Sequence, residues 1–254
     1  MRLLVWNDGQ VVEASQFRLE RPYVMQRIHT LGHRVYNISR HIELLREGSI
    51  ELFGFATLCG PADAERIIVK LLELSRVTQQ LSCPVAMRID CDGALSFEVE
   101  SPIYDTGMSL KSKRMVGIEI VIPTPDVESQ TSATIVADSM YEAMAIKRGG
   151  NAAIAVDVKG NIHSLPWRPI FVVYGGRVYT PNELHTVEYL SAKSAIESLG
   201  MELVVRNIPF ISLQQVDEVF LVDAMSVWSL STIKKHRLLS VVTSRITSRM
   251  EPRF

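Results

Sequence analysis

Apolar and polar positions in the second half of the chain alternate in an order that predicts a specific series of elements. Residues 136–148 place apolar side chains near one face of a predicted helix, which ends at Gly149. Residues 152–157 form an apolar run too short for a helix, so they predict a buried strand. Residues 170–180 predict a tight hairpin around a pair of glycines, and Pro181 ends it.

The first half of the chain predicts a small layer of strands covered by two helices. Helices are expected at 41–53 and 61–74, the second opened by Pro61 and followed by a wide apolar stripe. The remaining expected strands are residues 3–6, 11–13, 34–38, 85–90, 95–99, 116–122, 202–206 and 218–222, and further helices are expected at 186–199, 212–216 and 238–250. We therefore expect an α+β fold with an N-terminal α+β domain over 1–115 and a larger C-terminal α/β domain over 116–254.

Composition narrows the class of protein. The 254 residues have a formal net charge of −1, which argues against nucleic-acid binding because a phosphate-binding surface needs excess Lys and Arg. No apolar run is long enough for a transmembrane helix, and the start of the chain predicts a hairpin rather than a secretory signal. Cys59, Cys83 and Cys91 lack metal-ligand spacing and indicate reduced, buried thiols. A cytoplasmic protein is expected.

Other chemical motifs are weak. His29, His33 and His41 could suggest a metal cluster, but we favour polar surface histidines and expect no metal site. The Gly-x-Ser-x-Gly motif of serine hydrolases is absent. The basic residues from 234 to 253 indicate a solvated face rather than a binding site. Trp167 and Arg168 lie in a loop bounded by prolines. They are candidates for either a ligand pocket or a dimer contact, and the sequence does not favour one hypothesis over the other.

One order of motifs in the second half resembles a known family. The motifs are Gly149, Ala152-Ala153-Ile154, Val156-Asp157, Lys159-Gly160, Ser164-Leu165, Ile170-Phe171 and Thr180-Pro181, with further segments at 190–202 and 216–221. This order resembles the cofactor domain of the class IV aminotransferases, which include branched-chain and D-amino-acid aminotransferases and aminodeoxychorismate lyase. The resemblance implies a two-domain fold with a cofactor cleft, pyridoxal phosphate as the family's cofactor, and a homodimer.

The resemblance also indicates where the catalytic lysine should lie. In the family pattern this lysine precedes the residue matched to Asp157 by about 26 to 28 positions, and it forms the Schiff base with the cofactor. Gln130 or Thr131 occupies that place, and neither side chain can form an imine. Lys113, in a charged loop, is the candidate if the protein is active with a relocated lysine.

Other matched positions depart from the family as well. The acidic partner of the pyridine nitrogen corresponds to Ser164, followed by Leu165, and the phosphate-binding arginine corresponds to Asn37, with Arg34 as a possible substitute. The phosphate-cradling turn corresponds to residues 184–189, which contain neither Gly nor Arg.

Taken together, these departures predict a class IV aminotransferase-like protein without the catalytic lysine and acidic partner. Such a protein would be non-catalytic, would need no cofactor, and could bind a small anionic metabolite or a protein partner. The alternative is an active pyridoxal-phosphate-dependent aminotransferase or lyase. The residues expected to line the cleft are Arg34, Asn37, Gln130, Thr131, Ser164, Leu165, Trp167 and Arg168.

Overall fold

The computed structural model of the protein describes residues 3–103, 107–111, 115–125, 127–232 and 240–250. The chain divides into two compact units, the first made of residues 1–107 and 127–133 and the second of residues 108–126 and 134–254. The domain boundary expected between residues 115 and 116 stays a prediction.

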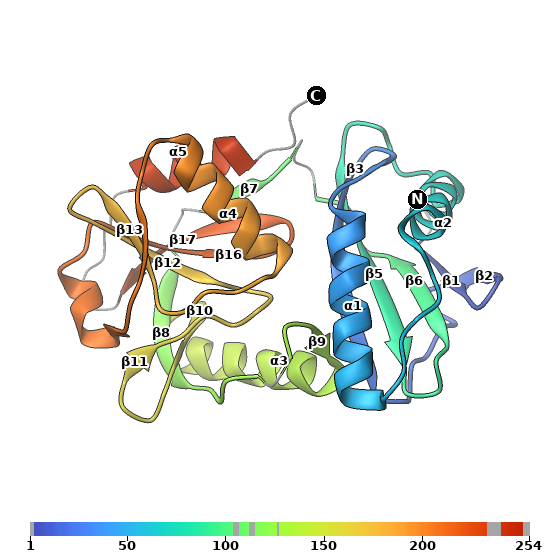
Figure 1. The fold of residues 1–254 in the computed structure, drawn as a ribbon, viewed down its shortest axis with the longest axis horizontal. Coiled ribbons are helices and arrows are strands. Elements are labelled where there is room, and N and C mark those ends of the chain that lie inside the picture. Colours follow the sequence, from blue (N-terminus) through green and yellow to red (C-terminus); the bar gives the residue numbers. More distant parts are fainter. Residues whose placement is uncertain (1–2, 104–106, 112–114, 126, 233–239, 251–254) are drawn as a thin grey trace. The chain divides into compact units, whose positions relative to one another are not determined.

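The first unit is a seven-stranded sheet with two helices packed on it (Figure 1). Its strand order is β2-β1-β6-β5-β3-β4, and β9 pairs with β3 outside that path. The bounds are β1 Leu4–Asn7, β2 Gln10–Glu13, β3 Tyr23–Leu31, β4 Arg34–Val35, α1 Ile38–Phe53, α2 Pro61–Leu74, β5 Ser82–Asp90, β6 Leu95–Val99 and β9 Gln130–Thr131.

The core of the first unit lies between the sheet and the two helices. Ile42 and Leu45 of α1 and Ile68 of α2 pack with Val85 and Phe97 of the sheet in one apolar cluster. Burial of such side chains supplies most of the stability of a unit of this size.

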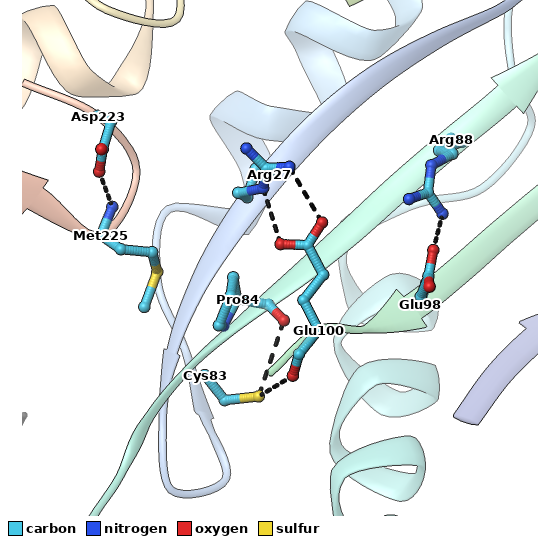
Figure 2. Close-up of polar contacts among 8 residues, drawn as sticks. All are labelled: Arg27, Cys83, Pro84, Arg88, Glu98, Glu100, Asp223 and Met225. Carbon is cyan, nitrogen blue, oxygen red and sulfur yellow. Dashed lines mark hydrogen bonds and ion pairs between the residues drawn. The ribbon is translucent and has the colours of Figure 1, made fainter. Parts of the chain in front are cut away.

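An ion pair also ties the first unit together across its central strands. Arg27 on β3 donates from Nε and Nη2 to the two carboxylate oxygens of Glu100, at 2.9 and 3.0 Å (Figure 2). Glu100 follows β6, and β5 lies between β6 and β3. The paired contact therefore joins two strands that are not direct neighbours.

The second unit is built on a ten-stranded sheet with the order β14-β13-β12-β16-β17-β8-β10-β11-β15, and β7 pairs with β17. Its strands are β7 Ser109–Lys111, β8 Val116–Val121, β10 Ala152–Val156, β11 Asn161–Ile162, β12 Ile170–Tyr174, β13 Arg177–Thr180, β14 Leu203–Val205, β15 Ile208–Pro209, β16 Glu218–Val222 and β17 Ser226–Thr232. Its helices are α3 Ser132–Lys147, whose first two residues belong to the first unit, α4 Val187–Ser198, the 3-10 helix η1 Phe210–Gln214 and α5 Val241–Met250.

Helices pack on two different parts of this sheet. Phe171 and Phe220 stack with ring centroids 5.1 Å apart, and Tyr189 of α4 and Ile246 of α5 pack in the same cluster. Ala145 of α3 packs instead with buried residues of β8 and β10. The buried carboxylate of Glu218 fixes α5, because it accepts hydrogen bonds from the first backbone N–H groups of that helix (Val242, 2.8 Å; Thr243, 2.7 Å).

The sequence predicted the fold class and most elements correctly. The hairpin glycines Gly175 and Gly176 have φ of 58° and 78°, as the turn requires. Several elements differ. α1 and α3 begin earlier than predicted, and η1 begins two residues before the start of the helix expected at 212–216. The strands β3, β7, β9, β11, β15 and β17 were not predicted. In the described part of the chain, every helix is too short or too polar to cross a bilayer.

Candidate functional site

The residues matched to the catalytic lysine lie on β9 of the first unit. Gln130 pairs with Met25 of β3, and Thr131 pairs with Val24, in an antiparallel register. Both side chains are half-buried. Because alternate residues of a strand point to opposite faces, only one of the two can face a given ligand.

A buried chain of hydrogen bonds, which we call the His41 chain, holds the segment just before β9. Ser129 Oγ donates to Leu44 O of α1 at 2.8 Å, and it accepts from Gln26 Nε2 at 2.9 Å. Gln26 Oε1 lies 3.0 Å from His41 Nδ1, which must therefore carry the proton. A Cβ added at Gly48 would lie 3.1 Å from Ser129 Cβ, so α1 approaches this segment closely.

The His41 chain corrects one sequence prediction. Burial lowers the pKa of His41 to about 3, so the ring is neutral. His29 is also buried, with Nε2 3.0 Å from Ser82 Oγ. The interpretation of both as surface histidines is wrong, because β3 is buried on both faces and the first turns of α1 pack against the sheet. Within the described residues, no group of three or more His, Cys, Asp or Glu side chains could hold a metal.

The position matched to the phosphate arginine lies at the start of α1. Asn37 is exposed, has φ of 54°, and precedes the first residue of α1 without a side-chain cap. Arg34 is exposed on β4. Arg40, the other nearby arginine, pairs with Glu43 at 3.0 Å and Glu47 at 3.6 Å along the helix.

In the second unit, Ser164 and Leu165 have structural roles. Ser164 is 1% exposed, its Oγ accepts from Ile170 N at 3.1 Å, and its N–H donates to Asn182 Oδ1 at 2.9 Å. Leu165 is buried in the cluster beneath α3, and its carbonyl accepts from Arg168 N at 2.9 Å. Residues 164–168 therefore form a tight turn that is hydrogen-bonded to the start of β12.

Trp167 and Arg168 connect this turn to α3. We call these two residues and their partners on α3, Asp138 and Glu142, the Arg168 cluster. Trp167 Nε1 donates to Asp138 Oδ2, and Arg168 Nη1 donates to Glu142 Oε1 at 2.9 Å. Arg168 Nη2 lies 3.8 Å from Asp138 Oδ1, an ion-pair distance too long for a hydrogen bond. Burial raises the pKa of Asp138, and the nearby Arg168 charge and the Trp167 hydrogen bond oppose that rise.

The segment matched to the phosphate turn starts α4. Thr186 caps the helix by accepting from Tyr189 N, and the carboxylate of Glu188 lies in the first turn. Tyr189 is buried and stacks on Phe171 with centroids 5.7 Å apart; burial raises the pKa of its hydroxyl to about 12. This helix start therefore already has an acidic side chain where a phosphate would need donors.

The structure places the predicted site residues in two groups. Gln130, Thr131, Asn37 and Arg34 belong to the first unit, whereas Ser164, Leu165, Trp167 and Arg168 belong to the second. Lys113 lies outside the described residues. Asp138 and Glu142 were not predicted as site residues, although their spacing of four residues on a predicted helix and the arginine in a later loop were a usable signal.

Comparison with known proteins identifies the family. The sequence model of the amino-transferase class IV family matches residues 24–233, so the chain belongs to the class IV aminotransferases. The fold of the branched-chain aminotransferase from Thermoproteus uzoniensis is similar, with a TM-score of 0.77, 19% identity, and coverage of 98% of this chain and 94% of that one. No curated protein matches this chain.

Two further solved structures share the fold. The branched-chain aminotransferase from Escherichia coli aligns with a TM-score of 0.77 and 16% identity, over 97% of this chain and 92% of that one. An aminotransferase from Brucella abortus bound to the cofactor PLP aligns with a TM-score of 0.78 and 14% identity, over 98% of each chain.

These comparisons correct the expectation that no cofactor is needed. That expectation is wrong, because the family's enzymes use pyridoxal phosphate and a structural neighbour holds it. The residue types at the matched positions remain as described. Gln130 and Thr131 have no amine, Ser164 has no carboxyl group, and Glu188 brings a carboxyl group to the segment matched to the phosphate turn. These side chains do not fit the contacts of the family's covalent site, and we derive no reaction step from them.

Proposed function

We propose that this class IV aminotransferase-like protein holds a small anion, with pyridoxal phosphate as the first ligand to test, without a covalent link at β9. In this proposal the protein does not transfer amino groups. The observation that carries it is the amide of Gln130 and the hydroxyl of Thr131 at the matched positions on β9. Bound pyridoxal phosphate would supply an aldehyde and an electron-accepting ring, and a lysine amine is what anchors it in transaminases.

The His41 chain supports this proposal. Ser129, adjacent to Gln130, is fixed by two hydrogen bonds of 2.8 and 2.9 Å, and its partners lie on α1 and β3. A residue beside such a fixed point presents its side chain in one orientation, which suits recognition of a ligand by hydrogen bonds.

The test is a titration of the full chain with pyridoxal phosphate, read by melting temperature and visible absorption, followed by borohydride and mass mapping. We expect the melting temperature to rise with ligand concentration, because a ligand of the native state stabilises it. We expect no lysine to be modified by borohydride. Stoichiometric modification of one lysine would overturn the proposal.

Two variants identify which matched residue faces the ligand. Gln130→Lys and Thr131→Lys place an amine on opposite faces of β9, so only one of them should gain a borohydride-fixed adduct. Gln80→Lys, at an exposed position of the first unit, is the matched control. Equal labelling of all three variants would indicate nonspecific reaction and would remove the support from β9.

An active aminotransferase is the second candidate, favoured by family membership and by the neighbour that holds the cofactor. It requires a lysine away from β9, and Lys113 is the residue to replace. In that case, Lys113→Ala would abolish a borohydride-fixed adduct that the unaltered chain forms.

We also propose a homodimer. The supporting observation is the exposure of Val136 (62%), Met140 (62%) and Met144 (40%), which follow one another at four-residue spacing on α3. Met140→Glu would place a charge in that stripe and should shift the sedimentation mass from dimer to monomer. An unchanged mass would exclude α3 from the interface. A cytoplasmic location stays a prediction.

A further inference from the structure

The second unit contains a cavity whose lining includes none of the residues named above as cofactor-site candidates. Its volume is about 530 Å³, within the range of small-molecule sites. It is lined by one end of β8, the residue after α3, the turn between β10 and β11, β15 and η1. In Figure 1, β8, β10 and β11 lie side by side in this unit.

One wall of the cavity is apolar. Phe210 at the start of η1 is half-buried against the core cluster of β10 and β12. Ile118 of β8 also belongs to the lining, but it is 5% exposed and packs in the cluster of β8, β10 and α3. Ile211 lies in the same lining and is 62% exposed, which is unusual for a large aliphatic side chain. An apolar ligand group would cover this exposed surface.

The rim carries two cations on fixed backbone. Arg148 donates from Nη1 to Glu119 O of β8 at 3.1 Å, which uses one of the five N–H donors of its guanidinium. Lys159 is held by its backbone N–H, which donates to Asp157 Oδ1 at 2.8 Å. Phe210 N donates to Gly160 O at 2.9 Å, so the turn between β10 and β11 is hydrogen-bonded to the start of η1.

Charge and shape together define the ligand. The lining contains Arg148 and Lys159 against one acid, Glu119, and its remaining residues are apolar, glycine or amide. A guanidinium pairs with a planar carboxylate through parallel hydrogen bonds. We propose that this cavity, the β8–β15 pocket, binds a small amphipathic carboxylate, with its carboxylate at Arg148 and Lys159 and its apolar body against Phe210 and Ile211.

This site is independent of the function proposed above. None of its lining residues is among the candidates on β9, the start of α1 or the Ser164 loop. Binding in the pocket therefore succeeds or fails whatever the behaviour of the chain toward pyridoxal phosphate.

The test uses 3-phenylpropionate as the probe and the full chain labelled at isoleucine methyl groups. We expect saturable shifts of the Ile118 and Ile211 methyl signals in NMR spectra. The neutral amide, 3-phenylpropanamide, has the same shape and should bind about tenfold more weakly, because it lacks the charge that the rim cations recognise. Equal affinity of the acid and the amide would overturn the proposal.

Surface variants complete the test. Arg148→Gln with Lys159→Gln should weaken 3-phenylpropionate binding about tenfold or more, since both cations are removed. Both residues are exposed, so the fold should persist. Lys193→Gln is the matched control, because Lys193 lies in the same unit and pairs with Glu183 at 3.0 Å outside the pocket. Undiminished binding in the double variant, or no saturable shift in the unaltered chain, would overturn the proposal.

Discussion

The His41 chain and the Arg168 cluster, one in each unit, bury polar side chains by different means. The His41 chain of the first unit consists of neutral groups, each of which donates to the next until Leu44 O ends the series. The Arg168 cluster of the second unit instead brings a cation to two carboxylates, with the Arg168 side chain 7% exposed. The first arrangement joins neutral groups by hydrogen bonds, whereas the second depends on charge balance.

The difference predicts opposite responses to acid. The pKa of His41 is lowered to about 3 by burial, so the folded state resists protonation and the stability that His41 contributes is lost as the pH falls below about 6.5. The pKa of Asp138 is raised, chiefly by burial. Its contribution is therefore fully present below the ordinary carboxyl pKa and is lost as the pH rises through the raised value.

The largest expected effect comes from removing the cation of the second unit. Arg168→Met leaves Asp138, whose side chain is 15% exposed, without its ion-pair partner. We expect a loss of about 3–5 kcal/mol in the free energy of unfolding of the second unit, because an uncompensated charge remains buried. Hydrogen exchange of the β12 and β16 amides measures this unit by itself.

A matched variant shows whether burial causes the loss. Arg177→Met removes an arginine of the same unit whose pair with Glu202 is 59% and 60% exposed. We expect a change of no more than about 1 kcal/mol there. Similar losses in both variants would mean that the Arg168 cluster is no more important than a surface pair.

The second expected effect is the acid sensitivity of the first unit. Between pH 6.5 and 4.5, the unaltered chain should lose about 2–3 kcal/mol in the opening free energy of β3 and β5 through His41, because only the unfolded state gains this proton. Hydrogen exchange of those amides at several pH values gives the curve.

His41→Asn removes the titrating ring and keeps a polar side chain. When the opening free energy of the β3 and β5 amides is plotted against pH, the variant should lack the part of the slope that His41 contributes. The variant should also be less stable than the unaltered chain at neutral pH. A variant curve parallel to that of the unaltered chain would show that His41 is not the group responsible. The predicted contrast in acid response between the His41 chain and the Arg168 cluster would then be wrong for the His41 chain.

Much of this architecture could be predicted from the sequence. The Gly175-Gly176 hairpin, the Pro61 helix start and the apolar run of β10 depend on local chemistry, and local patterns report it. β9 and β15 have two residues each and exist only through pairing with distant strands, so no local pattern indicates them. α3 is a different case: its apolar stripe predicted the helix correctly, but the fold leaves Val136, Met140 and Met144 of that stripe exposed.

The candidate site divides in the same way. The absence of a lysine at Gln130 and of an acid at Ser164 was visible in the sequence through the family resemblance. The contacts of these positions were not visible, because Ser129, Gln26 and His41 meet only when β3, α1 and the segment before β9 come together. The β8–β15 pocket likewise combines segments about a hundred residues apart in the chain, which periodicity cannot bring together.

The smallest expected effect is the pH dependence of the charged cluster. Asp138→Asn keeps the acceptor for Trp167 Nε1 but removes the titrating group. The stability of the unaltered chain minus that of the variant, measured on the β12 and β16 amides, should decrease as the pH rises from below the ordinary carboxyl pKa. The reason is that ionised Asp138 pays a desolvation cost that Arg168 offsets only in part, as the direction of its pKa shift indicates. The same comparison can be made between the Glu142→Gln variant and the Glu142→Gln, Asp138→Asn double variant. Any pH dependence that remains there does not come from the carboxylate of Glu142. A difference that increases with pH would mean that Arg168 outweighs burial at Asp138, and both units would then weaken in acid.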